Sequence, residues 1–209
     1  MMSEFKMDVM TLFIFMDNSG SVRGILPIYK KSIIEYVREQ YETSKTSDFV
    51  LKIVFTVFNS THKTNVFHVI DEQSLNELCD LIQNVHSEGS TSLYDTLYTV
   101  MNSSSSYIDE NNKKTLVFIS TDGEDTCSNQ YNDANVRRLF ESNPELEVYY
   151  CRIGENNHAE VAQNEVQNLF QGKARILSAG SYDAEQIETV IRTASRMATA
   201  LMSEQEQDN

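Results

Sequence analysis

Proline and glycine are scarce in this chain, with two prolines and seven glycines among 209 residues. Their scarcity argues against a long disordered linker. The remaining composition is that of a folded protein, with 40% hydrophobic and 23% charged residues. This length suits one domain with a sizeable core. We therefore expect a single domain over residues 1–203, followed by a polar tail over residues 204–209.

Positive charge is also in short supply. The 17 Lys and Arg residues stand against 31 Asp and Glu, which gives a formal net charge of -14. A surface with this balance repels the phosphate backbone and so excludes a general nucleic-acid binder. It favours cations or basic surfaces as partners, although the same charge also serves simply to solvate the exterior.

Features of secreted and membrane proteins are missing as well. The three cysteines, Cys79, Cys127 and Cys151, lack the spacing of a disulfide framework, and we expect free thiols in a reducing compartment. No run of 18 apolar residues is present, so no membrane span is expected. The first eight residues lack the basic start and the apolar stretch of a signal peptide. These absences predict a cytoplasmic protein without a membrane partner.

Short apolar runs alternate with amphipathic segments along the chain. The runs are too short for buried helices and predict strands at residues 9–16, 50–58, 66–70, 115–120, 148–153 and 174–178. Helical spacing of apolar residues predicts helices at residues 25–41, 74–85, 92–101, 133–140, 159–169 and 183–202. This alternation predicts a doubly wound α/β fold, with a mostly parallel central sheet and helices on both faces. The strand at 66–70 follows its predecessor closely, and we expect it to pair antiparallel at one edge.

Ligands of such sheets bind beyond the carboxyl ends of the strands, and three loops there carry informative residues. The first begins with Asp17 at the end of a buried strand, and Ser19 and Ser21 follow at alternate positions. The second loop places Thr91 just before a helix, and the third places Asp122 directly after another buried strand. Each pattern alone is as typical of a turn or a helix cap as of a ligand. We expect both aspartates on exposed loops, so that replacing either leaves the fold intact.

Taken together, the three motifs resemble those of the von Willebrand factor A domain. Asp-Asn-Ser-Gly-Ser, Gly-Ser-Thr-Ser-Leu-Tyr-Asp and Ser-Thr-Asp-Gly-Glu occur in the order and spacing of that family. The alternation of strands and helices over residues 9–201 also agrees with it. The resemblance implies a Rossmann-like fold with a metal-ion-dependent adhesion site formed by Asp17, Ser19, Ser21, Thr91 and Asp122. It also implies direct coordination by the two serines, and contact mostly through water for the two aspartates.

The donors of this set are all oxygens, which suits Mg²⁺ or, as alternatives, Mn²⁺ and Ca²⁺. Two carboxylates neutralise a divalent ion, and three hydroxyls add no charge, so the ion stays attractive to a carboxylate from another molecule. A water in its open position can be displaced by a partner's Asp or Glu. We therefore expect a non-enzymatic module that holds an acidic residue of a protein partner. By family analogy, that partner would be an AAA+ ATPase or a kinase and phosphatase system.

Two other functions remain open. A phosphatase or phosphotransferase of the haloacid dehalogenase type also places an aspartate after its first strand. Its second acid is replaced here by Ser19, which lacks the acidity of a carboxylic acid. A metal-free scaffold is the other alternative, and the complete set of five residues argues against it. Three further acids, Asp95, Glu124 and Asp125, are interpreted as loop or cap residues rather than as ligands.

Overall fold

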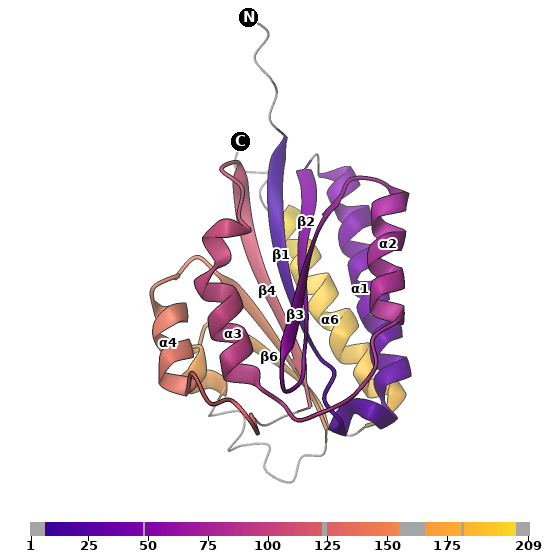
Figure 1. The fold of residues 1–209 in the computed structure, drawn as a ribbon. Coiled ribbons are helices and arrows are strands. Elements are labelled where there is room, and N and C mark those ends of the chain that lie inside the picture. The colour runs from indigo at the N-terminus through magenta and orange to yellow at the C-terminus, as the bar shows by residue number, and fades with distance from the viewer. Residues whose placement is uncertain (1–6, 48, 123–124, 155–165, 181, 204–209) are drawn as a thin grey trace, which may run out of the picture.

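The computed structural model describes residues 7–47, 49–122, 125–154, 166–180 and 182–203. Within them a six-stranded sheet has the order β3-β2-β1-β4-β5-β6. Its strands are β1 (Asp8–Asp17), β2 (Phe49–Phe58), β3 (His62–Val69), β4 (Asn112–Thr121), β5 (Glu147–Ile153) and β6 (Ala174–Ala179). All neighbours are parallel except β2 and β3. The predicted doubly wound α/β fold with one antiparallel edge strand is confirmed (Figure 1).

The central strand β1 explains why its sequence is apolar throughout. β1 pairs in parallel with β2 along one edge and with β4 along the other, and helices cover both of its faces. Leu12, Ile14 and Met16 enter the core on one face, while Phe13 and Phe15 enter the core on the other. All five side chains have no exposed surface. A polar residue at the end of this strand is therefore placed at the sheet edge by the strand itself.

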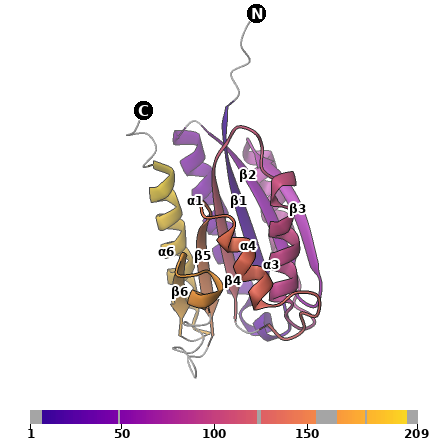
Figure 2. The same ribbon diagram turned by 90° about the vertical axis from the view of Figure 1, so that its left-hand side faces the viewer.

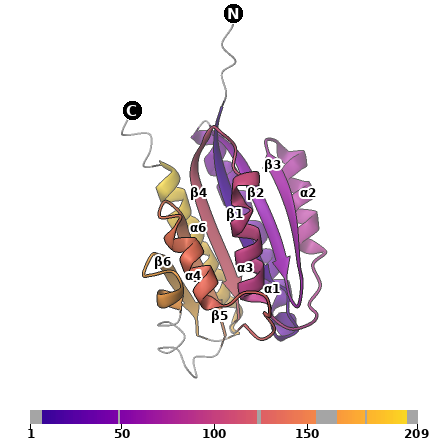
Figure 3. The ribbon, with the colours of Figure 1, turned by 60° about the vertical axis from the view of Figure 1, so that its left-hand side comes forward.

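Two helical layers enclose the sheet. On one face lie α1 (Leu26–Thr46), α2 (Glu72–Gln83) and α6 (Ala184–Ser203); on the other lie α3 (Leu93–Asn102) and α4 (Asp133–Glu141). Figure 3 shows α3 and α4 in front of the sheet, and Figure 2 shows β3 and β6 at its opposite sides. Short 3-10 helices occur at Ser21–Gly24 (η1) and Ser104–Ser106 (η2). None of the helices in the described ranges combines the length and apolar character needed to cross a membrane.

The antiparallel edge strand is longer than its sequence indicates. β3 begins at His62 and pairs with Phe58, whereas the apolar pattern starts only at residue 66. The connecting turn is correspondingly tight: the Asn59 N–H donates to the Thr61 carbonyl at 2.8 Å, and the Asn59 side chain accepts the Thr61 N–H at 3.0 Å. Polar residues fill the first half of β3 because one side of an edge strand faces solvent.

Among the described residues, the helix limits lie within two residues of the predicted ones except at the end of α1. α1 continues to Thr46, beyond the predicted end at residue 41, and its polar residue Gln40 is buried against α6, where it donates to the Ser195 hydroxyl at 2.8 Å. Most of the helix predicted at 159–169 lies outside the described residues, and residues 166–169 are helical.

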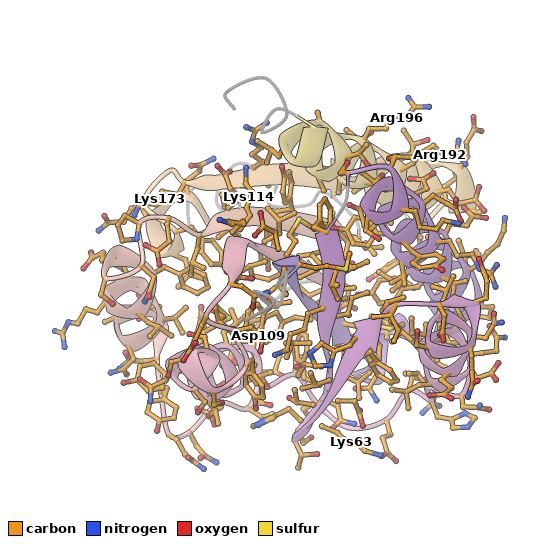
Figure 4. All side chains as sticks on the ribbon, turned by 90° about the horizontal axis from the view of Figure 1, so that it is seen from above. Lys63, Asp109, Lys114, Lys173, Arg192 and Arg196 are labelled. Atoms are coloured by element: carbon orange, nitrogen blue, oxygen red, sulfur yellow. The ribbon has the colours of Figure 1, made fainter. Side chains whose placement is uncertain are left out.

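A partly buried ion pair lies at the opposite end of the sheet, where the parallel strands begin. The Lys52 ammonium on β2 lies 3.0 Å from both carboxylate oxygens of Asp109, which precedes β4. Figure 4 looks onto this end and labels Asp109. Lys52 has only 7% of its side chain exposed. The pair joins β2 to the residues just before β4, at the end of the sheet opposite the carboxyl edge.

Candidate metal centre

Asp17 is the best-fixed residue of the predicted set. It ends β1, pairs in register with Phe58, and has no exposed surface. Its Oδ1 accepts the Ser19 backbone N–H at 2.8 Å, and its Oδ2 accepts the Thr121 hydroxyl at 2.6 Å. The expectation that Asp17 lies on an exposed loop was wrong, because the strand continues through it and the end of β4 covers it. Replacing it would leave two donors without their acceptor.

Asp122 lies beside Asp17 at the end of the neighbouring strand. It is partly buried. Burial raises the pKa of the Asp122 carboxyl above its ordinary value; the facing Ser21 hydroxyl lowers this pKa, and the Asp17 carboxylate raises it. The expectation that Asp122 lies on an exposed loop was thus only partly right. The Asp17 carboxylate thus disfavours the charge of Asp122 in a partly desolvated space.

Ser19 and Ser21 supply hydroxyls to the same space. Their Oγ atoms are 2.9 Å apart, with Ser19 buried and Ser21 exposed. Contacts therefore connect Asp17 to Ser19, Ser19 to Ser21, Ser21 to Asp122, and Asp122 to Asp17. The structure brings these four sequence-predicted residues into one cluster.

Thr91 is linked to the four-residue cluster only indirectly, through the loops on either side of it. It is buried, with 4% exposed surface, and its N–H donates to the Thr126 hydroxyl at 2.9 Å. Two residues before it, the Gly89 carbonyl accepts the Gly20 N–H at 2.9 Å, which joins the first loop to the second. The second and third loops are joined in turn by the Thr126 N–H, which donates to the Thr91 carbonyl at 2.8 Å. No hydrogen bond of the Thr91 hydroxyl is found among the described residues.

Hydrogen bonds from Asn18 fix the first loop to the end of β2 and to His86. The Asn18 N–H donates to the Phe58 carbonyl at 2.9 Å, and the Asn18 side-chain amide donates to the His86 carbonyl at 2.8 Å. Beneath the cluster, the buried Tyr29 hydroxyl donates to the Ser120 carbonyl at 2.5 Å, and burial raises the pKa of Tyr29 well above its ordinary value. Tyr29 is therefore a neutral donor that fixes the end of β4.

Sequence analysis assigned the nearby acids to loop and cap roles. The structure confirms this for Asp95 and Asp125, whose carboxylates accept hydrogen bonds from backbone N–H groups. Glu124 lies outside the described residues. How these acids connect the loops could not be predicted, because the donors are backbone groups more than 30 residues away in sequence.

The chemistry of the cluster depends on its hydroxyls. Within the described part of the chain, no group of three or more His, Cys, Asp or Glu side chains lies close enough to hold a metal ion. A cation bound here would need serine or threonine oxygens in addition to the two carboxylates. Such an all-oxygen set suits a hard divalent cation.

Comparisons with known proteins identify the fold. No protein-family model matches the chain, and no curated protein matches it. Among solved structures, the PilB minor pilin from Streptococcus sanguinis matches with a TM-score of 0.65 and 14% identity, over 94% of this chain and 62% of that one. A von Willebrand factor type A protein from Catenulispora acidiphila matches with a TM-score of 0.57 and 14% identity, over 90% of this chain and 42% of that one.

A third solved structure is similar in the same way. Proximal thread matrix protein 1 from the mussel byssus, with a zinc-occupied metal-ion-dependent adhesion-site motif, has a TM-score of 0.65 and 16% identity, over 92% of this chain and 48% of that one. The chain thus spans less than two thirds of the length of each of these structures. At these identities the likeness establishes the fold: this chain has the α/β fold of von Willebrand factor A domains.

The second loop yields a prediction at Gly89. Its φ of +71° is rarely adopted by residues with a side chain, and a Cβ there would lie 2.7 Å from the Ser60 Oγ. Gly89→Ala should destabilise the protein by about 1–3 kcal/mol. Gly24→Ala is the matched control, because a Cβ there meets nothing within 4 Å. Urea unfolding of the two variants checks this, and equal costs would contradict it.

The raised pKa of Asp122 yields a second prediction. Because the folded-state pKa exceeds the unfolded one, the stability contributed by the protonated carboxyl is present below the unfolded pKa and lost as pH rises through the folded pKa. In chelator, Asp122→Asn should therefore be more stable than the wild type at pH 7.5, with the difference shrinking towards pH 4. Thermal melts across this range measure it. A variant that is less stable than the wild type at pH 7.5 would contradict it.

Proposed function

We propose that this domain binds one divalent cation through Asp17, Ser19, Ser21, Thr91 and Asp122, and uses it to hold a carboxylate of a protein partner without catalysing a reaction. The observation that carries the proposal is the pairing of Asp17 and Asp122 in a partly desolvated cluster. Among the described residues, no Lys or Arg forms an ion pair with either. A cation between them would remove their repulsion.

The donor set fits such an ion in spacing as well as charge. Adjacent ligands of an octahedral ion with bonds of about 2.1 Å are about 3.0 Å apart. The Ser19 and Ser21 oxygens are 2.9 Å apart. This separation is that of a hydrogen bond between the two hydroxyls, and it places both oxygens close enough to contact one hard divalent cation. The structural neighbour with a zinc-occupied motif supports divalent binding on this fold.

When bound, the cation would supply an electrophilic centre that attracts an anionic ligand. The protein's own residues supply the rest. Ser19 and Ser21 contribute neutral oxygens, and Asp17 and Asp122 contribute the negative charge that a divalent ion requires. With no third carboxylate in the set, the site keeps its attraction for an acidic side chain. Ser21 is exposed, so the cluster is open to a partner on that side.

The haloacid dehalogenase alternative gains no support from the site. Ser19 stands where that chemistry needs a general acid, and its hydroxyl lies against Ser21. An adhesion or assembly role is in keeping with the structural neighbours, which include a minor pilin and a byssus protein. An AAA+ ATPase or a kinase and phosphatase system as partner, and a cytoplasmic location, stay predictions of the sequence.

Two exposed serines provide the sharpest test of metal binding. Calorimetric titration with Mg²⁺ and with Mn²⁺ should give one site per wild-type chain. Ser21→Ala should weaken binding by at least about tenfold, because it removes a neutral ligand from a small set. Ser90→Ala, an equally exposed serine in the second loop, should bind as the wild type does.

The partner is tested with the same variants. Capture of a cellular protein in Mg²⁺ should be lost in chelator and in Ser21→Ala, and kept in Ser90→Ala. A wild-type protein that binds neither ion at millimolar concentration would refute the proposal. Turnover of a generic phosphate ester with Mg²⁺ would instead favour the enzyme.

A further inference from the structure

We propose that Asp95 and Asp125 are positioning residues that hold Thr91 in place by fastening residues 125–131, here called the strap, to the amino end of α3. The proposal rests on the proposed function, since Thr91 matters only if the cluster binds a cation. Neither acid needs to touch the ion. Each acts through the strap, which contacts Thr91 directly.

The strap holds both polar backbone groups of Thr91. The Thr91 N–H donates to the Thr126 hydroxyl at 2.9 Å. The Thr91 carbonyl accepts the N–H groups of Thr126 at 2.8 Å and Cys127 at 3.0 Å. A buried residue bound at both its donor and its acceptor has little freedom to rotate. The position of the Thr91 backbone, and with it the direction of its Cα–Cβ bond, is therefore set by where the strap lies.

Asp125 fixes the first half of the strap to α3. Its Oδ1 accepts the Tyr94 N–H at 3.2 Å and the Ser128 hydroxyl at 2.5 Å, and its Oδ2 accepts the Ser128 N–H at 3.3 Å. Tyr94 lies in the first turn of α3, where backbone N–H groups have no partner within the helix. The Asp125 carboxylate thus accepts an N–H group that has no partner within the helix, and it also bonds Ser128 within the strap.

Asp95 fixes the second half of the strap. It lies on α3 and accepts hydrogen bonds from the strap, whereas Asp125 lies in the strap and accepts one from α3. Its own N–H donates to the Ser128 hydroxyl at 2.9 Å. Its two carboxylate oxygens accept the N–H groups of Asn129 at 3.0 Å, Gln130 at 3.1 Å and Tyr131 at 2.7 Å. Three donors converge on one side chain that is only partly exposed. A neutral amide in its place would offer one accepting oxygen and one clashing donor group.

A ring contact extends the strap along the helix. Tyr131 stacks on Tyr98, with ring centroids 3.9 Å apart and planes inclined by 24°. Tyr98 lies one turn beyond Asp95 on α3. The strap is thus joined to α3 at Tyr94, Asp95 and Tyr98, and to Thr91 just ahead of the helix. The second and third loops form one unit.

The hydrogen bonds of the two acids also keep their charge out of the ligand set. A carboxylate near the amino end of a helix is stabilised by the helix dipole and by the N–H groups that it accepts. Asp95 and Asp125 are committed in this way. They add no negative charge to the ligand set, so a divalent ion bound by Asp17 and Asp122 would keep its attraction for a partner's acid.

The test compares Mg²⁺ dissociation constants by calorimetry and stability in chelator by thermal melting. Thr126→Val removes the hydroxyl that accepts the Thr91 N–H at an exposed position, and Thr126→Ser keeps it. Asp95→Asn weakens the strap at its other end. We expect Thr126→Val and Asp95→Asn to weaken Mg²⁺ binding about tenfold or more, and Thr126→Ser to stay within about twofold of the wild type.

Asp71→Asn is the control for an effect of stability alone. Asp71 caps α2, accepting the Ser74 N–H at 2.8 Å and the Ser74 hydroxyl at 2.8 Å. Its loss should lower the Tm in chelator without changing the Mg²⁺ constant. If Asp95→Asn fails to fold, the two Thr126 variants decide the matter. Wild-type affinity in Thr126→Val would overturn the role of the strap and leave the proposed function standing; a wild-type protein that binds no Mg²⁺ would overturn both.

Discussion

The repulsion between two carboxylates is the constraint on which the candidate site depends. Asp17 and Asp122 end adjacent parallel strands, and burial together with the Asp17 charge raises the pKa of Asp122. Such a pair costs stability in a protein without a bound ion. Neighbouring hydroxyls and an N–H group offset part of this cost by donating to the carboxylates, and none of the described ion pairs supplies a positive charge to either acid.

The rest of the fold keeps this pair in place. Parallel pairing of β1 with β2 and β4 brings the ends of all three strands to one edge. The turn between β2 and β3 then supports the second loop, where the Ser60 hydroxyl accepts the Ser90 N–H at 2.9 Å and the Asn59 carbonyl accepts the Ser92 N–H at 2.8 Å. The antiparallel hairpin thus contributes to the candidate site without supplying a ligand to it.

Sequence patterns predict the buried parts of this arrangement well. β1, β2 and β4 are apolar because both of their faces are covered, and such runs are unambiguous. Edge and surface segments are harder. The first half of β3 is polar, and so are the residues of α1 beyond residue 41, so neither segment has an apolar signal. Pairing with β2 across a tight turn determines where β3 begins, whereas the extended end of α1 contacts α6, which is far away in the sequence.

The candidate site shows the same division. Three motifs, each at a strand end or a helix start, are enough to predict that their loops meet at one edge. The burial of Asp17 was missed because it depends on the Thr121 hydroxyl of another strand. The strap was missed because its donors are backbone N–H groups, which are alike in every residue. A sequence shows which side chains could act as ligands, whereas the loops that position those side chains are held largely by backbone hydrogen bonds.

The location of a bound cation tests the account most directly. Crystals soaked in Mn²⁺ would give anomalous difference density at each bound ion. The account predicts one strong peak within bonding distance of the Ser19 and Ser21 oxygens, on the side of the cluster that faces Asp17 and Asp122. Well-ordered loops with no peak there at millimolar Mn²⁺, or a peak only elsewhere on the chain, would contradict it.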